Sequence, residues 1–169
     1  MTLELSDITL TPYRQTLGAV AGILTKGREA NIDLDEVLGF SLYEDMLPFS
    51  FQIHSVVHHS LGALKGLESG AFGPPQNLPE LDYAGLQKLV DDTRATVDAY
   101  DANKVNARTG GEVVFGFNDM RIPFTSEGFV VTFSLPNLHF HATTAYDILR
   151  LKGVPLGKLN YMGQMQVKG

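Results

Sequence analysis

The sequence contains no cysteine and no tryptophan. Without cysteine, the chain cannot form a disulfide, a thiolate zinc site or an iron–sulfur cluster, and thiol catalysis is excluded. A metal ion would therefore need histidine, carboxylate, amide or water ligands, and the chain has five histidines. Because tryptophan is absent, aromatic contacts depend on ten phenylalanines and six tyrosines.

Long apolar runs and an excess of basic residues are also missing. No stretch approaches the roughly 20 apolar residues of a transmembrane helix, and residues 1–15 lack the basic and apolar regions of a secretory signal. The formal net charge is −6, whereas a general nucleic-acid-binding surface is basic. A hydrophobic content of 44% fits one globular domain over residues 1–169. We expect a cytoplasmic protein that binds neither nucleic acid nor membrane.

Apolar residues recur at helical spacing in four long segments. These segments are residues 11–27, 48–68, 82–100 and 126–150, the first with Thr11 as N-cap and the last interrupted at Pro136. Residues 69–80 are rich in glycine and proline, which indicates a loop. Residues 111–125 contain two β-type runs around Asn118-Asp119, which is typical of a hairpin. The predicted fold is mainly α: an up-down four-helix bundle with a small β-hairpin inserted before the last helix.

The second segment carries His54 and His58, four residues apart. This spacing places both on one helix face, one turn apart, where the pair could share a divalent metal. The alternative is two boundary histidines with ordinary hydrogen bonds. His59 points about 100° away from His58, so we expect it to face solvent or to pack at a helix boundary.

The last segment carries His139 and His141, which point to different sides because they are two residues apart. His141 belongs to the inward apolar stripe, and Asn137 lies four residues earlier on nearly the same face. His139 shares the other face with Tyr146 and Arg150. That face is either a polar binding surface or a hydrogen-bonded seam against another helix or a partner subunit.

Helical bundles build metal and substrate sites from side chains on facing helices. His54 and His58 could therefore converge with His141. Three neutral imidazoles would bind a divalent metal (Zn, Ni, Fe or Mn) and leave open positions for water or substrate. Without a metal, the same imidazoles would serve acid/base chemistry, because their ordinary pKa lies near neutrality.

Two motifs resemble a known family. "LPNLHFHATTAYDILRLKGVPLGK" resembles the last-helix signature of an uncharacterised branch of the DinB-like (YfiT-like) four-helix-bundle proteins, and "EDMLPFSFQI", which includes Gln52, resembles the start of its second helix. The resemblance extends over essentially the whole chain. It implies a DinB-like bundle, a homodimer as is frequent in the superfamily, and the divalent-metal site of many members. That site has one histidine on the second helix and two on the last in a His-x-x-x-His spacing.

The superfamily pattern is incomplete in this sequence. His141 fits the second histidine of the His-x-x-x-His spacing, but Asn137 stands in place of the first. His54 or His58 would then take the second-helix role, and the other would replace the missing ligand. Some superfamily members are thiol-dependent transferases or maleylpyruvate-type isomerases, so the resemblance leaves the reaction class open.

The expected function is that of a small-molecule enzyme, an isomerase, cyclase, hydrolase or transferase, with its pocket between the second and last helices. The candidate catalytic residues are His141, His58, Tyr146 and Arg150; the candidate substrate-binding residues are Asn137, Gln52 and His139; and the candidate metal ligands are His54, His58 and His141. The alternative is a non-catalytic, dimeric ligand-binding or scaffold protein that has lost the metal triad.

Overall fold

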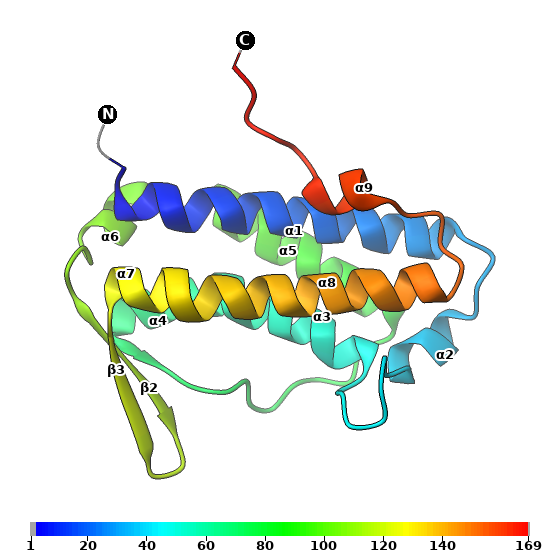
Figure 1. Cartoon of the computed structure of the whole chain (residues 1–169), viewed down its shortest axis with the longest axis horizontal. Coiled ribbons are helices and arrows are strands. Elements are labelled where there is room, and N and C mark those ends of the chain that lie inside the picture. The colour runs from blue at the N-terminus through cyan, green and yellow to red at the C-terminus, as the bar shows by residue number, and fades with distance from the viewer. Residues whose placement is uncertain (1–2, 169) are drawn as a thin grey trace.

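The computed structural model describes residues 3–168 and contains four long helical segments packed as a bundle (Figure 1). These segments are α1 (Leu5–Glu29), then α3 (Phe49–Val57) continuing through η1 (His58–Gly62) into α4 (Ala63–Ser69), then α5 (Tyr83–Asp98), and finally α7 (Ser126–Phe129) continuing through η2 (Val130–Ser134) into α8 (Leu135–Leu151). Shorter helices are α2 (Leu34–Gly39), α6 (Ala102–Asn106) and α9 (Lys158–Met162). Helix α1 packs along α5, and α3 packs along α8. The predicted mainly α bundle is confirmed.

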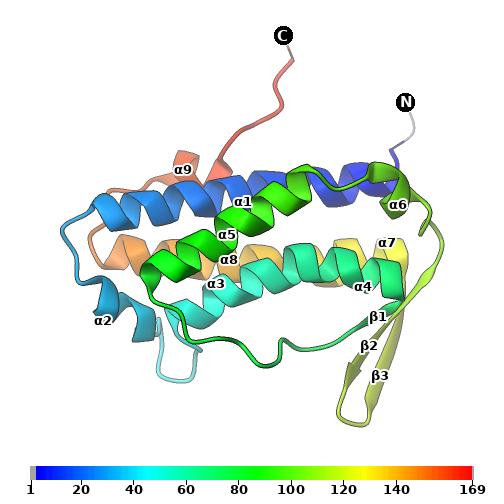
Figure 2. The same ribbon diagram turned by 180° about the vertical axis from the view of Figure 1, so that it is seen from behind.

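The four long segments do not alternate strictly in direction. Segments α1 and α7–α8 start at the end of the bundle that carries the sheet, whereas α4 and α5 both finish there (Figure 2). The backbone amide of Ser6 donates to Oδ1 of Asn106 at 2.8 Å, which ties the start of α1 to α6 at this end. The order is therefore up-down-down-up and not the expected simple alternation. The linker 73–82 makes this possible, because an extended chain covers about 3.3 Å per residue and a helix about 1.5 Å.

Helix α1 begins at Leu5, earlier than the predicted start at Thr11. The backbone amide of Glu4 donates to Oδ2 of Asp7 at 2.9 Å, so an acidic side chain supports the N-terminal turn. Pro12 consequently lies inside the helix, where it lacks the amide hydrogen of an ordinary helical residue. The sequence signal of an N-cap followed by proline was misleading because an earlier cap extends the helix.

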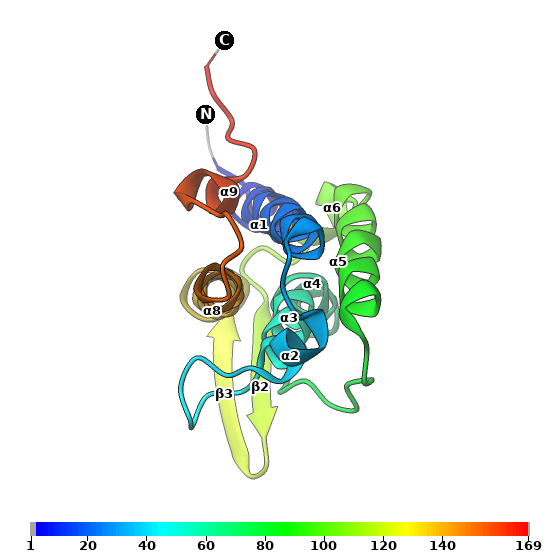
Figure 3. The ribbon, with the colours of Figure 1, turned by 90° about the vertical axis from the view of Figure 1, so that its right-hand side faces the viewer.

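The β-hairpin predicted around Asn118-Asp119 is present. Strands β2 (Glu112–Phe117) and β3 (Met120–Thr125) pair antiparallel, and Asn118 has φ of 49°, in the left-handed region that asparagine tolerates. Strand β1 (Ala71–Phe72) pairs parallel with β2, so the predicted loop 69–80 contains a short strand. The hairpin extends away from the bundle (Figure 3).

Both helices that carry histidines contain a π-helical turn, η1 in one and η2 in the other. Turn η2 directly precedes Leu135 and Pro136. Proline cannot donate a backbone hydrogen bond to the carbonyl four residues earlier, and the wider turn accommodates this. The expected interruption at Pro136 thus takes the form of a π turn within a continuous helical segment. A π turn also changes the direction of the side chains around it, and such turns are frequent at functional sites.

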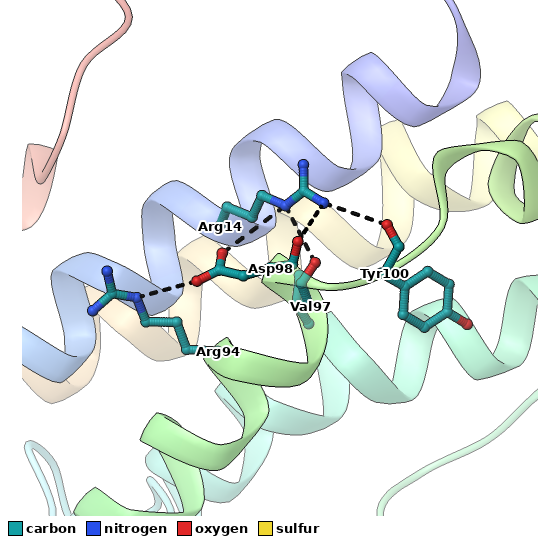
Figure 4. A network of polar contacts seen from close by, with 5 residues as sticks. All are labelled: Arg14, Arg94, Val97, Asp98 and Tyr100. Atoms are coloured by element: carbon teal, nitrogen blue, oxygen red, sulfur yellow. Dashed lines mark hydrogen bonds and ion pairs between the residues drawn. The ribbon is translucent and has the colours of Figure 1, made fainter.

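A polar network fastens α1 to the end of α5 (Figure 4). Nε of Arg14 donates to the carbonyl of Val97 at 3.2 Å, and Nη2 of Arg14 donates to the carbonyl of Asp98 at 3.1 Å. Nε of Arg94 lies 3.7 Å from Oδ2 of Asp98. The two hydrogen bonds from Arg14 satisfy carbonyls that the last turn of a helix leaves without partners.

Within residues 3–168, no helix combines the length and apolar character needed to cross a membrane.

Candidate functional site

Three histidines form a cluster between the second and last long segments. The ring centroids of His58 and His59 are 5.2 Å apart, and those of His59 and His141 are 5.7 Å apart with an interplanar angle of 13°. Aromatic side chains pack around the three imidazoles: Phe51, Phe72, Phe133 and Phe140. We call His58, His59 and His141 the histidine cluster.

His141 has a defined orientation and a defined tautomer. Nε2 of Gln52 donates to the carbonyl of Leu47 at 2.7 Å, which directs Oε1 of Gln52 towards His141. Nδ1 of His141 lies 2.7 Å from that oxygen and must be the donor, because an amide oxygen only accepts. The lone pair of the neutral ring is therefore on Nε2. Burial, followed by the nearby His58, lowers the pKa of His141 to about 4.

His59 is the most enclosed member of the cluster, with 7% of its surface exposed. Its Nδ1 is buried and has no hydrogen-bond partner among the described residues. Burial, then the proximity of His58 and His141, lowers the pKa of His59 to about 3. Its side chain was expected at the solvent or at a helix boundary, so this expectation is corrected. His59 lies at helical spacing from the buried residues Gln52, Val56 and Ala63, so the side of the helix that carries it faces the bundle.

His54 and His58 both hold the linker 73–82 against the second segment. Nε2 of His54 donates to the carbonyl of Pro79 at 3.1 Å, and Nε2 of His58 donates to the carbonyl of Gly73 at 2.7 Å. Burial lowers the pKa of both histidines. Both border a groove of about 270 Å³ beneath the linker, which Leu78 also lines. Among the described residues, no ring contact joins His54 to the histidine cluster.

The candidate residues on the other face of α8 do not join this cluster. Nδ1 of His139 lies 2.9 Å from the hydroxyl of Tyr161, which belongs to α9. The rings of Tyr146 and Tyr161 are 6.3 Å apart in an edge-on contact, and Arg150 is exposed farther along α8. The alternative of a hydrogen-bonded seam therefore describes His139, and Tyr146 adds a ring contact to the same seam, which is formed with a helix of the same chain.

Asn137 has a local role in the helix. Its Nδ2 donates to the carbonyl of Phe133 at 2.7 Å, which lies in the π turn η2. The amide thus satisfies a carbonyl next to the helix irregularity created by Pro136. Of the residues proposed from the sequence, the structure brings together His141, His58 and Gln52.

The three-histidine metal site that the resemblance implies does not fit this arrangement of donors. In the part of the chain that the structure describes, no group of three or more histidine, aspartate or glutamate side chains is placed to hold a metal ion. Asn137 uses its side-chain amide within its own helix, and His58 uses Nε2 for the carbonyl of Gly73. Nε2 of His141 keeps its lone pair available, because the hydrogen bond to Gln52 uses Nδ1.

Comparison with known proteins agrees with this fold. A solved structure described as a DinB family member protein from Shewanella denitrificans is similar, with a TM-score of 0.75 and 24% sequence identity over 98% of this chain and 95% of that chain. The fold is therefore that of a DinB-like helical bundle. Residues 5–162 match the domain of unknown function DUF1993, and the chain belongs to this family. Proteins with curated functions give no match. The predicted relationship to an uncharacterised DinB-like branch is confirmed.

Proposed function

We propose that the protein is a small-molecule enzyme in which His141 is the reacting imidazole. The observation that carries the proposal is the chain from the Leu47 carbonyl through Gln52 to Nδ1 of His141. A histidine held at one ring nitrogen presents the other nitrogen in a defined direction, as catalytic and metal-bound histidines do. Here the presented atom is Nε2, which would accept a proton from the substrate.

The protonation state of the histidine cluster supports a site for uncharged or proton-donating substrates. A pKa of about 4 for His141 and about 3 for His59 keeps both imidazoles neutral at pH 7. The surrounding phenylalanine rings, among them Phe51 and Phe133, bring no charge to the site. Isomerisation, cyclisation, hydrolysis and group transfer all include a proton transfer, and a neutral imidazole can accept that proton, most efficiently from an acidic group because the pKa of His141 is only about 4.

A substrate panel covering these four reaction classes tests the proposal. For a substrate that is turned over, we expect His141→Gln to lower kcat/KM by at least about 100-fold, the usual contribution of a positioned acid or base. His139→Gln is the matched control, since it removes a histidine from the opposite face of the same helix. Turnover that survives His141→Gln would refute the assignment. A ligand that binds near His141 without turnover would favour the non-catalytic alternative.

Metal binding is a separate proposal, in which the ion would be held through Nε2 of His141 without the complete three-histidine set that the resemblance implies. It is supported by the neutral state of His59 and His141, because an imidazole must be unprotonated to ligate a metal. Elemental analysis of protein purified without chelators tests it. Stoichiometric Zn, Ni, Fe or Mn that is lost in His141→Gln and retained in His139→Gln would support it, and metal-free protein at full activity would refute it.

The homodimer implied by the resemblance is also a proposal. Large apolar side chains are exposed on the last helical segment, including Val131 at 50% and Phe140 at 56%. Exposed apolar groups of this size favour association. Light scattering after gel filtration measures the mass in solution, and Phe140→Ser is expected to shift a dimer towards the monomer.

A further inference from the structure

A buried chain of hydrogen bonds connects three helices behind the histidine cluster. The hydroxyl of Ser134, at the end of η2, donates to the carbonyl of His59 at 2.8 Å, inside η1. The hydroxyl of Tyr13, on α1, is hydrogen-bonded to Oγ of Ser134. Ser134 has a single hydroxyl hydrogen, which the carbonyl of His59 takes, so Tyr13 must be the donor to Ser134.

Each group in this chain is removed from water. Tyr13 and Ser134 are 0% exposed, and His59 is 7% exposed. Burial raises the pKa of the Tyr13 hydroxyl far above its ordinary value, so it remains protonated and able to donate. A hydrogen bond without access to water is strong, and a polar group left unpaired in the same place destabilises the folded protein.

The bond made by Ser134 is unusual for a serine within a helix. Buried serines commonly donate to a carbonyl four residues earlier in their own helix, and Ser60 does so, donating to the carbonyl of Val56 at 2.7 Å. Ser134 instead reaches across to the other helical segment. The π turn η1, which contains His58 and His59, is therefore joined directly to the π turn η2 by one serine.

We propose that Tyr13 and Ser134 are positioning residues that hold the ring of His59 beside His141. The backbone of His59 is anchored through its carbonyl, and the ring then lies 5.7 Å from that of His141, nearly parallel to it. Because the Nδ1 of His59 has no hydrogen-bond partner of its own, the ring depends on this backbone anchor and on packing for its orientation. The catalytic meaning of this positioning rests on the proposed function, but the positioning itself does not.

The test compares Ser134→Ala, Tyr13→Phe and Ser60→Ala in the full chain. Ser60→Ala is the matched control, because it removes a buried hydroxyl from the residue next to His59 but not the bond between helices. Nitrogen-15 spectra of the histidine rings, assigned with His59→Gln, report the protonation of each imidazole. The titration is followed from about pH 8 to about pH 4, where the wild-type His59 ring should still be mostly neutral, since burial lowers its pKa to about 3, whereas a ring with a pKa of about 4 would be half protonated.

In Ser134→Ala, release of the ring should admit water and raise the proton affinity of His59 by at least about tenfold, or about one pKa unit. Tyr13→Phe keeps the bond from Ser134 and should show a smaller change in the same direction. Ser60→Ala should leave the ring spectrum unchanged. If Ser134→Ala does not fold, Tyr13→Phe decides the outcome.

Variants with native backbone spectra and an unchanged His59 ring would overturn the positioning role. An equal change in Ser60→Ala would show general loosening of the core and would overturn it as well. These measurements need no substrate. Failure of the proposed function would appear instead as turnover that survives His141→Gln while the His59 ring still responds to Ser134→Ala.

Discussion

Acid should destabilise the protein through His59, and the size of the effect follows from its burial. The pKa of His59 is lowered from 6.5 to about 3 by removal of the ring from water, with further contributions from His58 and His141. In the unfolded chain the ring takes up a proton once the pH falls below about 6.5, but the folded protein cannot bind that proton until about pH 3. The stability contributed by the neutral ring is therefore complete above about pH 6.5 and falls steadily below it.

The magnitude can be worked out from these two pKa values. Each pH unit below about 6.5 lowers the free energy of unfolding by about 1.4 kcal/mol until the folded-state pKa is reached. Between about pH 7 and about pH 5 the loss from His59 alone comes to about 2 kcal/mol. Solvent screening reduces this loss only slightly, because His59 is 7% exposed. The loss is a substantial part of a typical total stability of about 5–15 kcal/mol.

Equilibrium urea unfolding at the two pH values, with wild type and His59→Phe, measures this contribution. Phenylalanine fits the aromatic surroundings and carries no titratable group. From about pH 7 to about pH 5, the free energy of unfolding of the wild type should fall by about 2 kcal/mol more than that of His59→Phe. For an m-value near 2 kcal/mol/M, this corresponds to a further decrease of about 1 M in the urea midpoint. His139→Phe, a change on the exposed face of α8 away from the histidine cluster, should retain most of the wild-type loss. Parallel losses in wild type and His59→Phe would refute the burial of a neutral His59.

Two further changes give direct tests of contacts in the structure. Gln52→Glu places a carboxylate against Nδ1 of His141 and should raise the pKa of His141 by about 1–3 units from its value of about 4; an unchanged titration in ring spectra would contradict the contact. Gly27→Ala would bring its new Cβ into a clash with the hydroxyl of buried Tyr83 and should lower the free energy of unfolding by about 1–3 kcal/mol. Gly22→Ala, on the same helix with no atom within 4 Å of the new Cβ, should be neutral or stabilising by up to about 1 kcal/mol, and calorimetry that ranks the two alike would contradict the packing.

Much of the fold could be predicted because its signals are local. Helical periodicity located the four long segments, and two β-type runs around Asn118-Asp119 located the hairpin. The start of α1 was missed, since Thr11 followed by proline imitates a helix start inside a longer helix. Strand β1 was missed because two residues carry no periodicity, and their pairing depends on β2, far along the chain.

The candidate site was predicted in part. His141, His58 and Gln52 lie where the resemblance and the helix spacing suggested, between the second and last segments. His54 was grouped with them on α-helical spacing, but its ring bonds to the carbonyl of Pro79. His59 was set aside on the same spacing. A signal was available in the apolar residues of this helix, because His59 lies three residues after Val56 and four before Ala63.

The sequence by itself determined the chemistry that is possible here: histidine and amide groups with no thiol, on amphipathic helices whose apolar stripes require a bundle. Tertiary structure alone decided which histidines meet, which ring nitrogen of His141 is held, and which rings enclose His59. The physical reason is distance along the chain. Helices form from neighbours three and four residues apart, whereas the Gln52–His141 and Ser134–His59 bonds join residues 89 and 75 positions apart and exist only once the helices have packed.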